Sequence, residues 1–385
     1  MFEAYQQARG PRPLQFVIYP TYTCNLSCNY CFQSSQLHAQ PAVLTRPQVD
    51  DLFAAVREIS ATRPEKTAQI VLFGGEPLLP TTETAVGWIL DRAAEAGHTV
   101  QIVTNGTHLP RFAGALRRHR EILTGAQITL DGPQEVHDAR RKRANGGGSY
   151  DNVMRAVEVC LEVGLEVKLR VNLDAQNIGS LADLASLLED RGWARRTGFQ
   201  CYLAPVTDHV GTSTYPFLMR EDELVEPVLE FWRQRPELKE VLDFRLFRVL
   251  HHLISVMQGD RSWTLPRFHY CEVDGGEMFS FGPDNLIYQC PESVGDAKSA
   301  VGTYSPRFEL WPRRLQAWQG RSVLTLPECQ QCSIATFCGG GCAYAALRRL
   351  GRPSRAVCGD APGVIRAYMR FVRRQFQNGA LPVGA

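Results

Sequence analysis

The sequence predicts an α/β fold: a partial (β/α)6 barrel of the TIM type, followed by a small cysteine-rich α+β domain. Short apolar runs alternate with amphipathic helical patterns between residues 14 and 205. Most of these apolar runs are followed by glycine-containing or polar residues that are typical of loops. The composition becomes rich in Cys and Gly after residue 268. The six alternations indicate parallel strands with right-handed crossovers, and they fall short of a closed eight-stranded barrel.

The individual elements follow from periodicity and end signals. The predicted strands cover 14–19, 69–73, 99–104, 126–130, 166–173 and 198–203, and the predicted helices cover 45–59, 82–96, 149–163 and 179–190. Thr45 and Ser149 are expected as N-caps, with Pro47 in the first turn of its helix. Barrel enzymes carry their chemistry at the carboxyl ends of the strands, so we expect the site there.

Changes in composition divide the chain into five expected segments. These are an N-terminal arm at 1–13, the barrel at 14–205, a helical bridge at 206–268, the cysteine-rich domain at 269–362, and a C-terminal helix and tail at 363–385. The bridge shows helical patterns around 221–234 and 237–258 without strand alternation. The cysteine-rich segment has few long apolar runs, so its folded state needs additional cross-links such as metal sites.

Composition excludes several classes of protein. The chain has 385 residues, 44% of them hydrophobic, and a formal net charge of +2, which gives no argument for nucleic acid or a membrane as partner. Its first 13 residues lack the apolar core of a signal peptide, and no run approaches 18 apolar residues. We therefore expect a cytoplasmic location, in which most of the twelve cysteines are reduced metal ligands. Cys160 and Cys201 stand apart from the others and are expected in the core.

Three cysteines on one short loop form the central motif of the sequence. Cys24, Cys28 and Cys31 are spaced C-x3-C-x2-C directly after the first apolar run. Three thiolates can hold three irons of a [4Fe–4S] cube and leave the fourth iron open for another ligand. A structural zinc site would need a fourth ligand, and no His or Cys follows at the required distance.

This motif, with Tyr30 just before its last cysteine, resembles the radical S-adenosylmethionine (radical SAM) superfamily. The resemblance implies that the amino and carboxylate groups of S-adenosylmethionine chelate the open iron. An electron from the cluster then splits the sulfonium, and the resulting 5′-deoxyadenosyl radical takes a hydrogen from the substrate. It also implies that Cys24, Cys28 and Cys31 are the catalytic cluster ligands, and that the barrel is of the partial (β/α)6 kind.

Further motifs match the same family. Gly74-Gly75-Glu76-Pro77 resembles its GGEP motif, which lies along the methionine part of S-adenosylmethionine; the alternative is a turn with a solvated Glu. Glycines allow a backbone edge to approach a ligand closely.

The candidate groups for the carboxylate and the ribose come from two other strand ends. The resemblance implies that Thr129 and Arg141 hold the S-adenosylmethionine carboxylate, a task that suits the arginine fork, although Arg140 and Arg143 lie close by. Asn172 is a candidate ribose contact, or simply a polar residue at a strand end.

The second cysteine group resembles the SPASM extension of radical SAM enzymes, which binds auxiliary [4Fe–4S] clusters. Its core spacing is C-x2-C-x5-C-x3-C with a later cysteine. By that resemblance one auxiliary cluster is closed by four cysteines, which are Cys329, Cys332, Cys338 and Cys358. A second auxiliary cluster uses three cysteines, which are Cys271, Cys290 and Cys342. Asn285 replaces a family glycine, and Asn also tolerates the left-handed conformation of a hairpin turn. Either another residue completes the three-cysteine cluster or one iron stays open, and two zinc sites are the alternative for the whole region.

The resemblance implies a radical enzyme that forms thioether or carbon–carbon crosslinks in a ribosomally made peptide. Oxidation of a Cys or Ser side chain, as in sulfatase maturation, and a small-molecule dehydrogenase or epimerase are alternatives. A pure electron-transfer protein would have no use for GGEP at a strand end. Candidate bases are Glu292, Asp296 and Asp208. We expect a flavodoxin- or ferredoxin-type reductant, a peptide or protein substrate, and three [4Fe–4S] clusters in addition to S-adenosylmethionine.

Overall fold

The computed structural model describes residues 13–378 except 62, 64–66, 212, 239–241, 245–246 and 259–265. The expected N-terminal arm, apart from Pro13, and the end of the expected tail lie outside these residues. Within the described residues no helix combines the length and the hydropathy that a membrane crossing requires.

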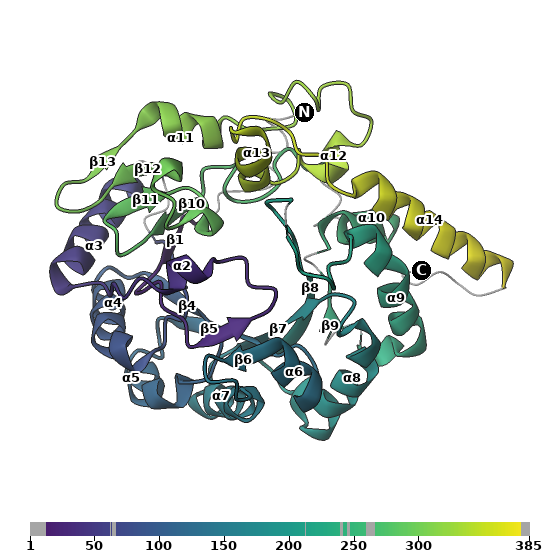
Figure 1. Cartoon of the computed structure of the whole chain (residues 1–385), viewed down its shortest axis with the longest axis horizontal. Helices are drawn as coiled ribbons and strands as arrows, with labels where there is room; N and C mark the ends of the chain where they lie inside the picture. The colour runs from purple at the N-terminus through teal and green to yellow at the C-terminus, as the bar shows by residue number, and fades with distance from the viewer. Residues whose placement is uncertain are drawn as a thin grey trace.

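Six parallel strands form the centre of the molecule, as the sequence predicted. They occur in chain order within the sheet, and Figure 1 shows them curving around a central space. Their bounds are β1 (Gln15–Ile18), β3 (Gln69–Leu72), β4 (Thr99–Thr104), β5 (Leu123–Thr129), β7 (Val167–Leu173) and β8 (Phe199–Pro205). The predicted and observed bounds agree to within three residues, because each strand carries buried apolar residues on the face that packs against the outer helices.

Two short strands that the sequence did not predict extend this sheet at its edges. β9 (Leu242–Asp243) pairs in parallel with β8, although the bridge was expected to be helical, and β10 (Met278–Phe281) pairs in parallel with β1. The sheet continues in antiparallel order through β11 (Leu286–Tyr288), β12 (Ala300–Thr303) and β13 (Glu309–Leu310). Among the described residues β9 and β10 do not pair with each other, so the barrel is open, and the cysteine-rich segment shares its sheet.

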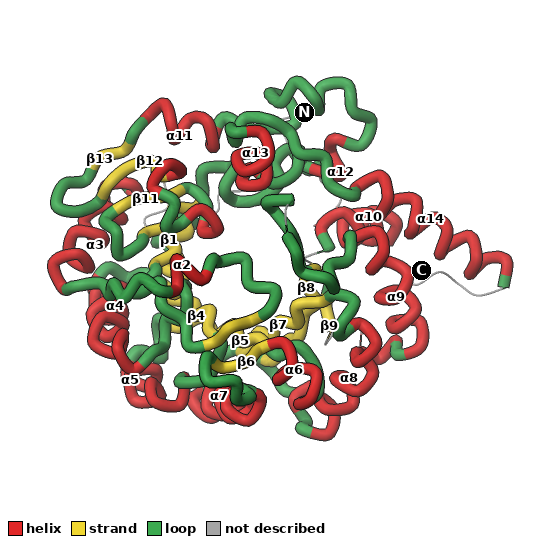
Figure 2. Tube along the Cα trace, in the orientation of Figure 1, coloured by secondary structure: helices red, strands yellow, loops and turns green. Residues whose placement is uncertain are grey.

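Helices cover the outer face of the sheet, as the red segments around the yellow strands show in Figure 2. The helices that follow the barrel strands are α3 (Arg46–Ser60), α4 (Glu83–Glu95), α5 (Ala113–Arg118), α6 (Gln134–Arg140), α7 (Tyr150–Val163) and α8 (Leu181–Asp190). The others are α2 (Ser35–His38), α9 (Glu221–Gln234), α10 (Arg248–Gln258), α11 (Pro312–Gln319), α12 (Ala335–Cys338), α13 (Ala343–Leu350) and α14 (Ala361–Gln377). At the start of α3 the predicted N-cap forms, since the Thr45 N–H donates to the Gln48 side chain at 2.9 Å.

The alternation of side chains in the strands separates a core from a cavity. In β4, Val100 and Ile102 are fully buried against the helices, while Gln101 and Val103 point to the interior and are only half-buried. The main core lies between the sheet and the outer helices and includes Cys160 and Cys201, as predicted. The inner side of the sheet is therefore free to hold a site.

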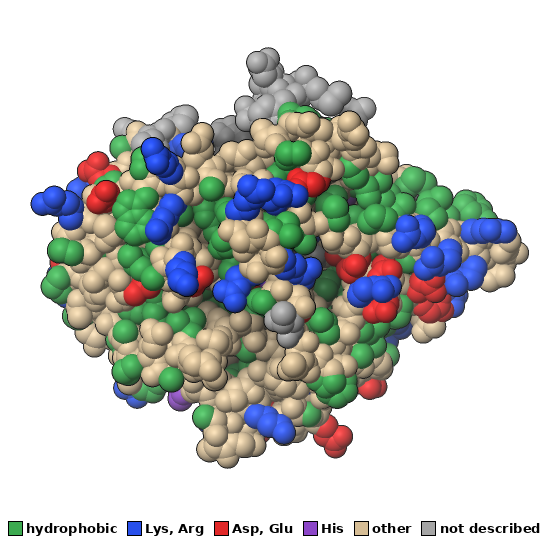
Figure 3. Space-filling model, turned by 45° about the horizontal axis from the view of Figure 1, so that its top comes forward, with side chains coloured by type: hydrophobic (Ala, Val, Ile, Leu, Met, Phe, Trp, Pro, Cys, Tyr) green, Lys and Arg blue, Asp and Glu red, His purple; other side chains and the backbone are tan. Residues whose placement is uncertain are grey.

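The C-terminal part is attached to the barrel by strand pairing, by packing in the main core and by polar contacts. The Tyr19 hydroxyl of the β1 end donates to the Pro291 carbonyl at 2.7 Å. Glu226 of α9 pairs with Arg374 of α14 at 2.6 Å, and Figure 3 shows acidic and basic side chains beside each other where α14 projects. These contacts place the cysteine-rich segment next to the open side of the barrel.

Candidate functional site

A cavity of about 390 Å³ opens at the carboxyl ends of the strands. The predicted site residues that line it are Cys24, Cys28, Tyr30, Cys31, Gly74, Gly75, Glu76, Thr129, Arg141, Asn172 and Glu292. Pro77 lies behind them and its carbonyl accepts a hydrogen bond from Thr82 at 2.6 Å. Residues from six different strand ends thus meet at one place, although they are spread over most of the chain.

The cysteine loop forms one wall of the cavity. β2 (Leu26–Cys28) holds its middle part, Cys24 and Cys28 are half-buried, and Cys31 is exposed. Burial and the neighbouring Glu76, Cys28 and Cys31 together raise the pKa of Cys24 to about 12. Thiols with raised pKa values are poor nucleophiles and need a nearby cation to become thiolates, so the chemistry of this donor set fits an iron–sulfur cluster.

The two glycines are required by the cysteine loop itself. A Cβ atom on Gly75 would lie 2.2 Å from the Tyr22 carbonyl oxygen and 2.4 Å from that of Thr23. The sequence predicted a close backbone approach here, but to a ligand. The structure shows that glycine first allows the GGEP segment to pack against the cysteine loop.

Glu76 is 1% exposed, which excludes the alternative of a turn with a solvated Glu. Its Oε1 accepts hydrogen bonds from Thr104 Oγ1 at 2.5 Å and from the Leu78 N–H at 2.9 Å, and its Oε2 accepts one from the Asn105 N–H at 2.6 Å. Burial raises the pKa of Glu76 and these hydrogen bonds oppose the rise. A buried oxygen with remaining acceptor capacity therefore faces the cavity.

Thr104 and Asn105 were not predicted as site residues. Asn105 Nδ2 donates to Asn25 Oδ1 at 2.9 Å and lies 3.9 Å from Cys24 Sγ, so the end of β4 supports the cysteine loop. The Thr-Asn-Gly sequence at a strand end was the available signal, because such punctuation marks the carboxyl edge of the sheet.

The structure distinguishes the three neighbouring arginines. β6 (Arg141–Arg143) pairs with β2 so that Arg141 stands opposite Cys28, and Arg141 lines the cavity. Arg140 is fully buried behind it, with ion pairs of 2.5 Å to Asp174 and 3.3 Å to Asp131. Arg143 turns away and donates to the Gly148 carbonyl at 2.9 Å. Of the three, Arg141 is the arginine that a bound ligand can reach.

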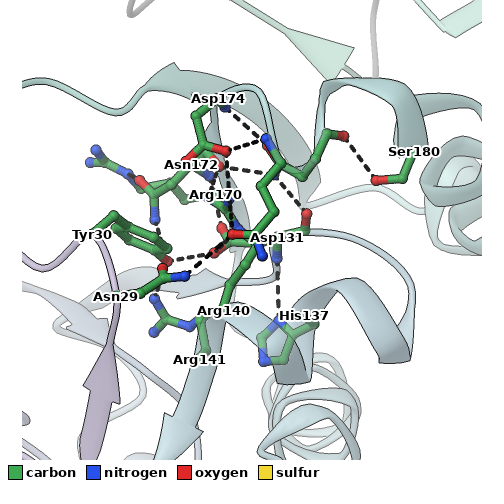
Figure 4. Close-up of polar contacts among 12 residues, drawn as sticks. Asn29, Tyr30, Asp131, His137, Arg140, Arg141, Arg170, Asn172, Asp174 and Ser180 are labelled. Atoms are coloured by element: carbon green, nitrogen blue, oxygen red, sulfur yellow. Dashed lines mark hydrogen bonds and ion pairs between the residues drawn. The ribbon is translucent and has the colours of Figure 1, made fainter. Parts of the chain in front are cut away.

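Tyr30 connects the cysteine loop to this arginine, as Figure 4 shows. Its hydroxyl donates to Asp131 Oδ2 at 2.5 Å and accepts from Arg141 Nη1 at 2.6 Å and from Asn172 Nδ2 at 3.1 Å. Thr129, at the end of β5, is 8% exposed and also lines the cavity. The candidate carboxylate and ribose contacts therefore share one cluster of polar groups.

Arg141 shows that this wall of the cavity fits an anionic ligand. Its Nε is buried and has no hydrogen-bond partner among the described residues. Buried donors are nearly always paired, and a carboxylate is the acceptor that best matches a guanidinium edge. The cavity volume also falls within the range of cofactor pockets.

Comparison with known proteins identifies the family. The profile of the radical SAM superfamily matches residues 18–188. Mycofactocin maturase MftC of Mycobacterium ulcerans (strain Agy99) is 32% identical over 333 residues, which cover 84% of this chain and 80% of that protein. The chain belongs to the radical SAM superfamily. The predicted family is thereby confirmed, and with it an enzyme that uses S-adenosylmethionine and a [4Fe–4S] cluster.

Other relatives of this radical SAM enzyme match over different lengths. The serine-type anaerobic sulfatase-maturating enzyme of Bacteroides thetaiotaomicron is 30% identical and is covered over 94% of its length. Pre-heme d1 synthase of Dinoroseobacter shibae is 30% identical over 188 residues, and the chain spans only 43% of that protein. Among solved structures, anSMEcpe with bound AdoMet and Kp18Cys peptide superimposes with a TM-score of 0.69 at 17% identity, over 95% of this chain and 98% of that one. This last likeness confirms the fold.

Some of the remaining cysteines of the radical SAM enzyme lie near one another. Burial and the neighbouring Cys338, Cys358 and Cys332 together raise the pKa of Cys329 to about 11, so these sulfurs interact. Burial also raises the pKa of Cys290, with contributions from neighbours that include Cys342 and Cys271.

In the part of the chain that the structure describes, no three His, Cys, Asp or Glu side chains are close enough to surround a single metal ion. The assignment of these cysteines to auxiliary clusters or to zinc sites stays a prediction.

The three candidate bases occupy different positions. Glu292 lines the cavity, and its Oε1 lies 3.2 Å from Nε2 of His209, while its buried Oε2 has no partner among the described residues. Asp208 lines a smaller neighbouring cavity, where it accepts from the backbone N–H groups of Gly211 at 2.8 Å and Ser213 at 2.9 Å. Although burial raises the pKa of Asp208, these hydrogen bonds hold it below the ordinary value.

Asp296 lies in a surface turn, and neither cavity includes it. Its side chain accepts from the Lys298 N–H at 3.1 Å and from the Ser299 hydroxyl at 2.8 Å. Both Asp208 and Asp296 are thus committed to their own loops. Glu292 is the candidate that has an oxygen to spare inside the cavity.

His209 was missed by the sequence analysis. Burial lowers its pKa, but hydrogen bonds and charge interactions with Cys342 and Glu292 outweigh burial and raise the pKa to about 10. Its ring also packs edge-on against Tyr344 at a centroid distance of 6.2 Å. A single loop histidine after a strand carries no sequence signal, and only the tertiary structure brings it between the cavity and the C-terminal cysteines.

Proposed function

We propose that this radical SAM enzyme cleaves S-adenosylmethionine reductively and oxidatively modifies a side chain of a peptide or protein, forming a thioether or carbon–carbon crosslink in a ribosomally made peptide. The observation that carries the proposal is the cavity, where three cysteines, the GGEP segment and the unpaired Arg141 nitrogen meet. When bound, the cluster and S-adenosylmethionine supply the 5′-deoxyadenosyl radical that removes a substrate hydrogen.

The residues of the chain have separate tasks in this proposal. Cys24, Cys28 and Cys31 hold the cluster next to the GGEP segment, which lies along the methionine moiety. Arg141 and Thr129 bind the carboxylate of the cofactor, and Asn172 lies where the ribose is expected. The opposing wall, from the β8 loop and residues 291–292, is left for the substrate.

Glu292 is our candidate for the group that takes a proton from the substrate. Its unpaired Oε2 is buried at the cavity, and Cys290 lies two residues away in the chain. Formation of a crosslink removes one hydrogen atom, then one proton and one electron, from the substrate. In the proposal Glu292 would accept the proton, and Cys271, Cys290 and Cys342 would hold an auxiliary cluster that supplies an acceptor for the electron.

A second cavity supports a peptide substrate. It has a volume of about 210 Å³ and shares Tyr30, Cys31, Phe32, His209 and Glu292 with the first. Its rim is partly apolar, with Phe32 47% exposed and Leu218 36% exposed. Such a rim suits a chain that carries side chains beyond the reacting one, and the solved relative anSMEcpe was crystallised with a bound peptide.

The auxiliary clusters, the reductant and the location complete the proposal. Cys329, Cys332, Cys338 and Cys358 would close one auxiliary cluster, which gives three clusters and about twelve irons per chain. A flavodoxin- or ferredoxin-type protein in the cytoplasm would supply the electron for cleavage. Anaerobic reconstitution followed by iron and zinc analysis tests this count; about four irons together with zinc would contradict it.

Oxidation of a Cys or Ser side chain is the second candidate function. It is favoured by the 30% identity to a serine-type sulfatase-maturating enzyme over 94% of that protein. Mass spectrometry separates the two products: a crosslink removes two hydrogens from one peptide and joins two residues, whereas side-chain oxidation leaves all residues unlinked.

The proposed electron acceptor is tested with Cys290→Ala in the full-length enzyme. The variant should still form 5′-deoxyadenosine but should not form modified peptide, both measured in the same reaction with a candidate precursor peptide. Cys201→Ala, which alters a core thiol far from any cluster, is the matched control. A normal product yield from Cys290→Ala would favour a redox-neutral reaction such as epimerisation.

A further inference from the structure

The Tyr30 side chain lies between the groups that are proposed to bind the two ends of the cofactor. A phenolic hydroxyl has one proton to donate and two lone pairs to accept with, and here all three are used. Asp131 receives the proton at 2.5 Å, and Arg141 and Asn172 donate to the lone pairs at 2.6 Å and 3.1 Å. Figure 4 shows the hydroxyl among these three side chains.

The direction of these hydrogen bonds is fixed by Asp131. Its Oδ1 accepts from the Asn172 N–H at 2.9 Å, and its Oδ2 accepts from Arg140 Nε at 3.3 Å as well as from Tyr30. Asp131 therefore acts as a carboxylate acceptor, so the Tyr30 hydroxyl must donate to it and must offer its lone pairs to the other two groups. Arg140, whose guanidinium carbon lies 4.8 Å from the centre of the Tyr30 ring, holds the ring from behind.

The consequence for Arg141 is a fixed rotation of its guanidinium plane. Nη1 is held by the Tyr30 hydroxyl, while the buried Nε has no partner among the described residues. The edge that Nε shares with the second terminal nitrogen is then available for two parallel hydrogen bonds to a carboxylate. Without the hydroxyl, the guanidinium would be free to turn toward Asp131.

We propose that Tyr30 is a positioning residue whose hydroxyl sets the Arg141 fork for the carboxylate of S-adenosylmethionine. This inference rests on the proposed role of Arg141. It gives the aromatic residue of the cysteine motif a task that its ring alone could not perform, and it distinguishes Tyr at this position from Phe.

The test compares two ligands with the anaerobically reconstituted full-length enzyme. S-Adenosylmethionine carries the carboxylate, and 5′-methylthioadenosine lacks the amino-acid part. Tyr30→Phe should weaken binding of S-adenosylmethionine roughly tenfold, the effect of one charged hydrogen bond, and should change binding of 5′-methylthioadenosine less than about twofold, both measured by calorimetry. In Arg141→Lys protein, Tyr30→Phe should cost less than about twofold, because the group it positions is gone.

Tyr215→Phe is the matched control. Its hydroxyl belongs to the same cluster and donates to Asp174 at 2.7 Å, and its ring packs against Tyr30 at 6.4 Å, but no contact to Arg141 is made. Tyr215→Phe should leave the affinities for S-adenosylmethionine and 5′-methylthioadenosine within about twofold of wild type, since it removes a neutral hydroxyl that does not contact the Arg141 guanidinium.

The inference would be overturned by unchanged affinity of Tyr30→Phe for S-adenosylmethionine, by an equal loss for both ligands, or by additive losses with Arg141→Lys. Loss of iron from Tyr30→Phe would also overturn it, in favour of a role in holding the cysteine loop. If wild-type protein neither binds nor cleaves S-adenosylmethionine, the proposed function fails instead, so the two failures are separable.

Discussion

The cysteines of the barrel and those of the C-terminal segment are held by different means. Cys24, Cys28 and Cys31 follow β1, and the sheet that carries them is fixed by a continuous apolar core. The cysteines between 271 and 358 lie mostly on loops. Cys290 belongs to the same main core, Cys271 and Cys338 pack against it, and Cys329 lies in a small separate apolar cluster. A buried polar network supplements this packing.

Arg321 is the centre of that network. It is 1% exposed, pairs with Asp274 at 3.0 Å, and donates to the carbonyl oxygens of Gly340 and Gly341 at 2.6 Å and of Pro353 at 2.9 Å. One side chain thus fastens the two loops that flank Cys342 and Cys358. The comparison teaches that the barrel site is preformed by packing, whereas the C-terminal cysteines depend on packing, on polar contacts around Arg321 and, in our proposal, on metal.

The largest expected effect comes from emptying the barrel site. Replacing Cys24, Cys28 and Cys31 together by Ala should reduce 5′-deoxyadenosine formation to background and remove about four irons. The thermal unfolding of the barrel should change little, because these thiols lie outside its core. Cys160→Ala changes a core thiol and is the control: it should lower the thermal stability and leave 5′-deoxyadenosine formation intact. Turnover by the triple variant would contradict the assignment of Cys24, Cys28 and Cys31 as cluster ligands.

The second effect concerns the C-terminal network. Arg321→Met leaves Asp274 buried without its ion-pair partner and several carbonyl oxygens buried without this donor, which should cost about 3–5 kcal/mol and loosen the segment from 269 to 362. Hydrogen exchange should show lost protection there and retained protection in β3 and β4. Arg313→Met, at an exposed position of α11, is the control and should have no measurable effect. Uniform loss of protection would show that the two regions unfold as one unit.

A smaller effect is expected at the ligand end of the barrel. Arg141→Lys replaces a fork by a point charge and should weaken S-adenosylmethionine binding by about 1–3 kcal/mol in calorimetry. Arg143→Lys should leave the affinity unchanged, since that side chain faces Gly148. A loss at Arg143 with none at Arg141 would reverse the assignment.

The smallest effect tests a backbone detail of the C-terminal segment. Asn285 has a φ of 69°, in the turn between β10 and β11, and its Oδ1 accepts from Gln48 at 2.6 Å. Asn285→Ala should destabilise the protein by about 1 kcal/mol more than Asn285→Gly, because only glycine adopts this conformation without strain. Equal free energies of unfolding for the two variants would show that the side-chain hydrogen bond, not the backbone, matters.

The sequence predicted the barrel strands well because the face of each strand toward the outer helices is buried and therefore carries apolar residues. It missed β9, a two-residue strand at the sheet edge that carries little pattern of its own, and it missed β10, which lies between β11 and β1. β10 joins β1 only because the chain returns after more than 250 residues, so the attachment of the cysteine-rich segment to the barrel sheet could not be read from local composition.

What the sequence by itself determined is the donor chemistry. The spacing of Cys24, Cys28 and Cys31, the GGEP motif and the cysteine series from 329 to 358 define ligand types and their local order. The left-handed turn at Asn285 was also foreseen, because the conformational preference of Asn is a local property.

Only the tertiary structure decided which neighbours complete the site. Arg140 and Arg141 are adjacent and identical in type, yet pairing of Arg141 with Cys28 sends one to the cavity and the other to buried carboxylates. His209 meets Glu292 although 83 positions separate them, as their numbers show. The physical reason is that side-chain direction depends on strand register and on long-range packing, which are properties of the assembled sheet and not of any short stretch of chain.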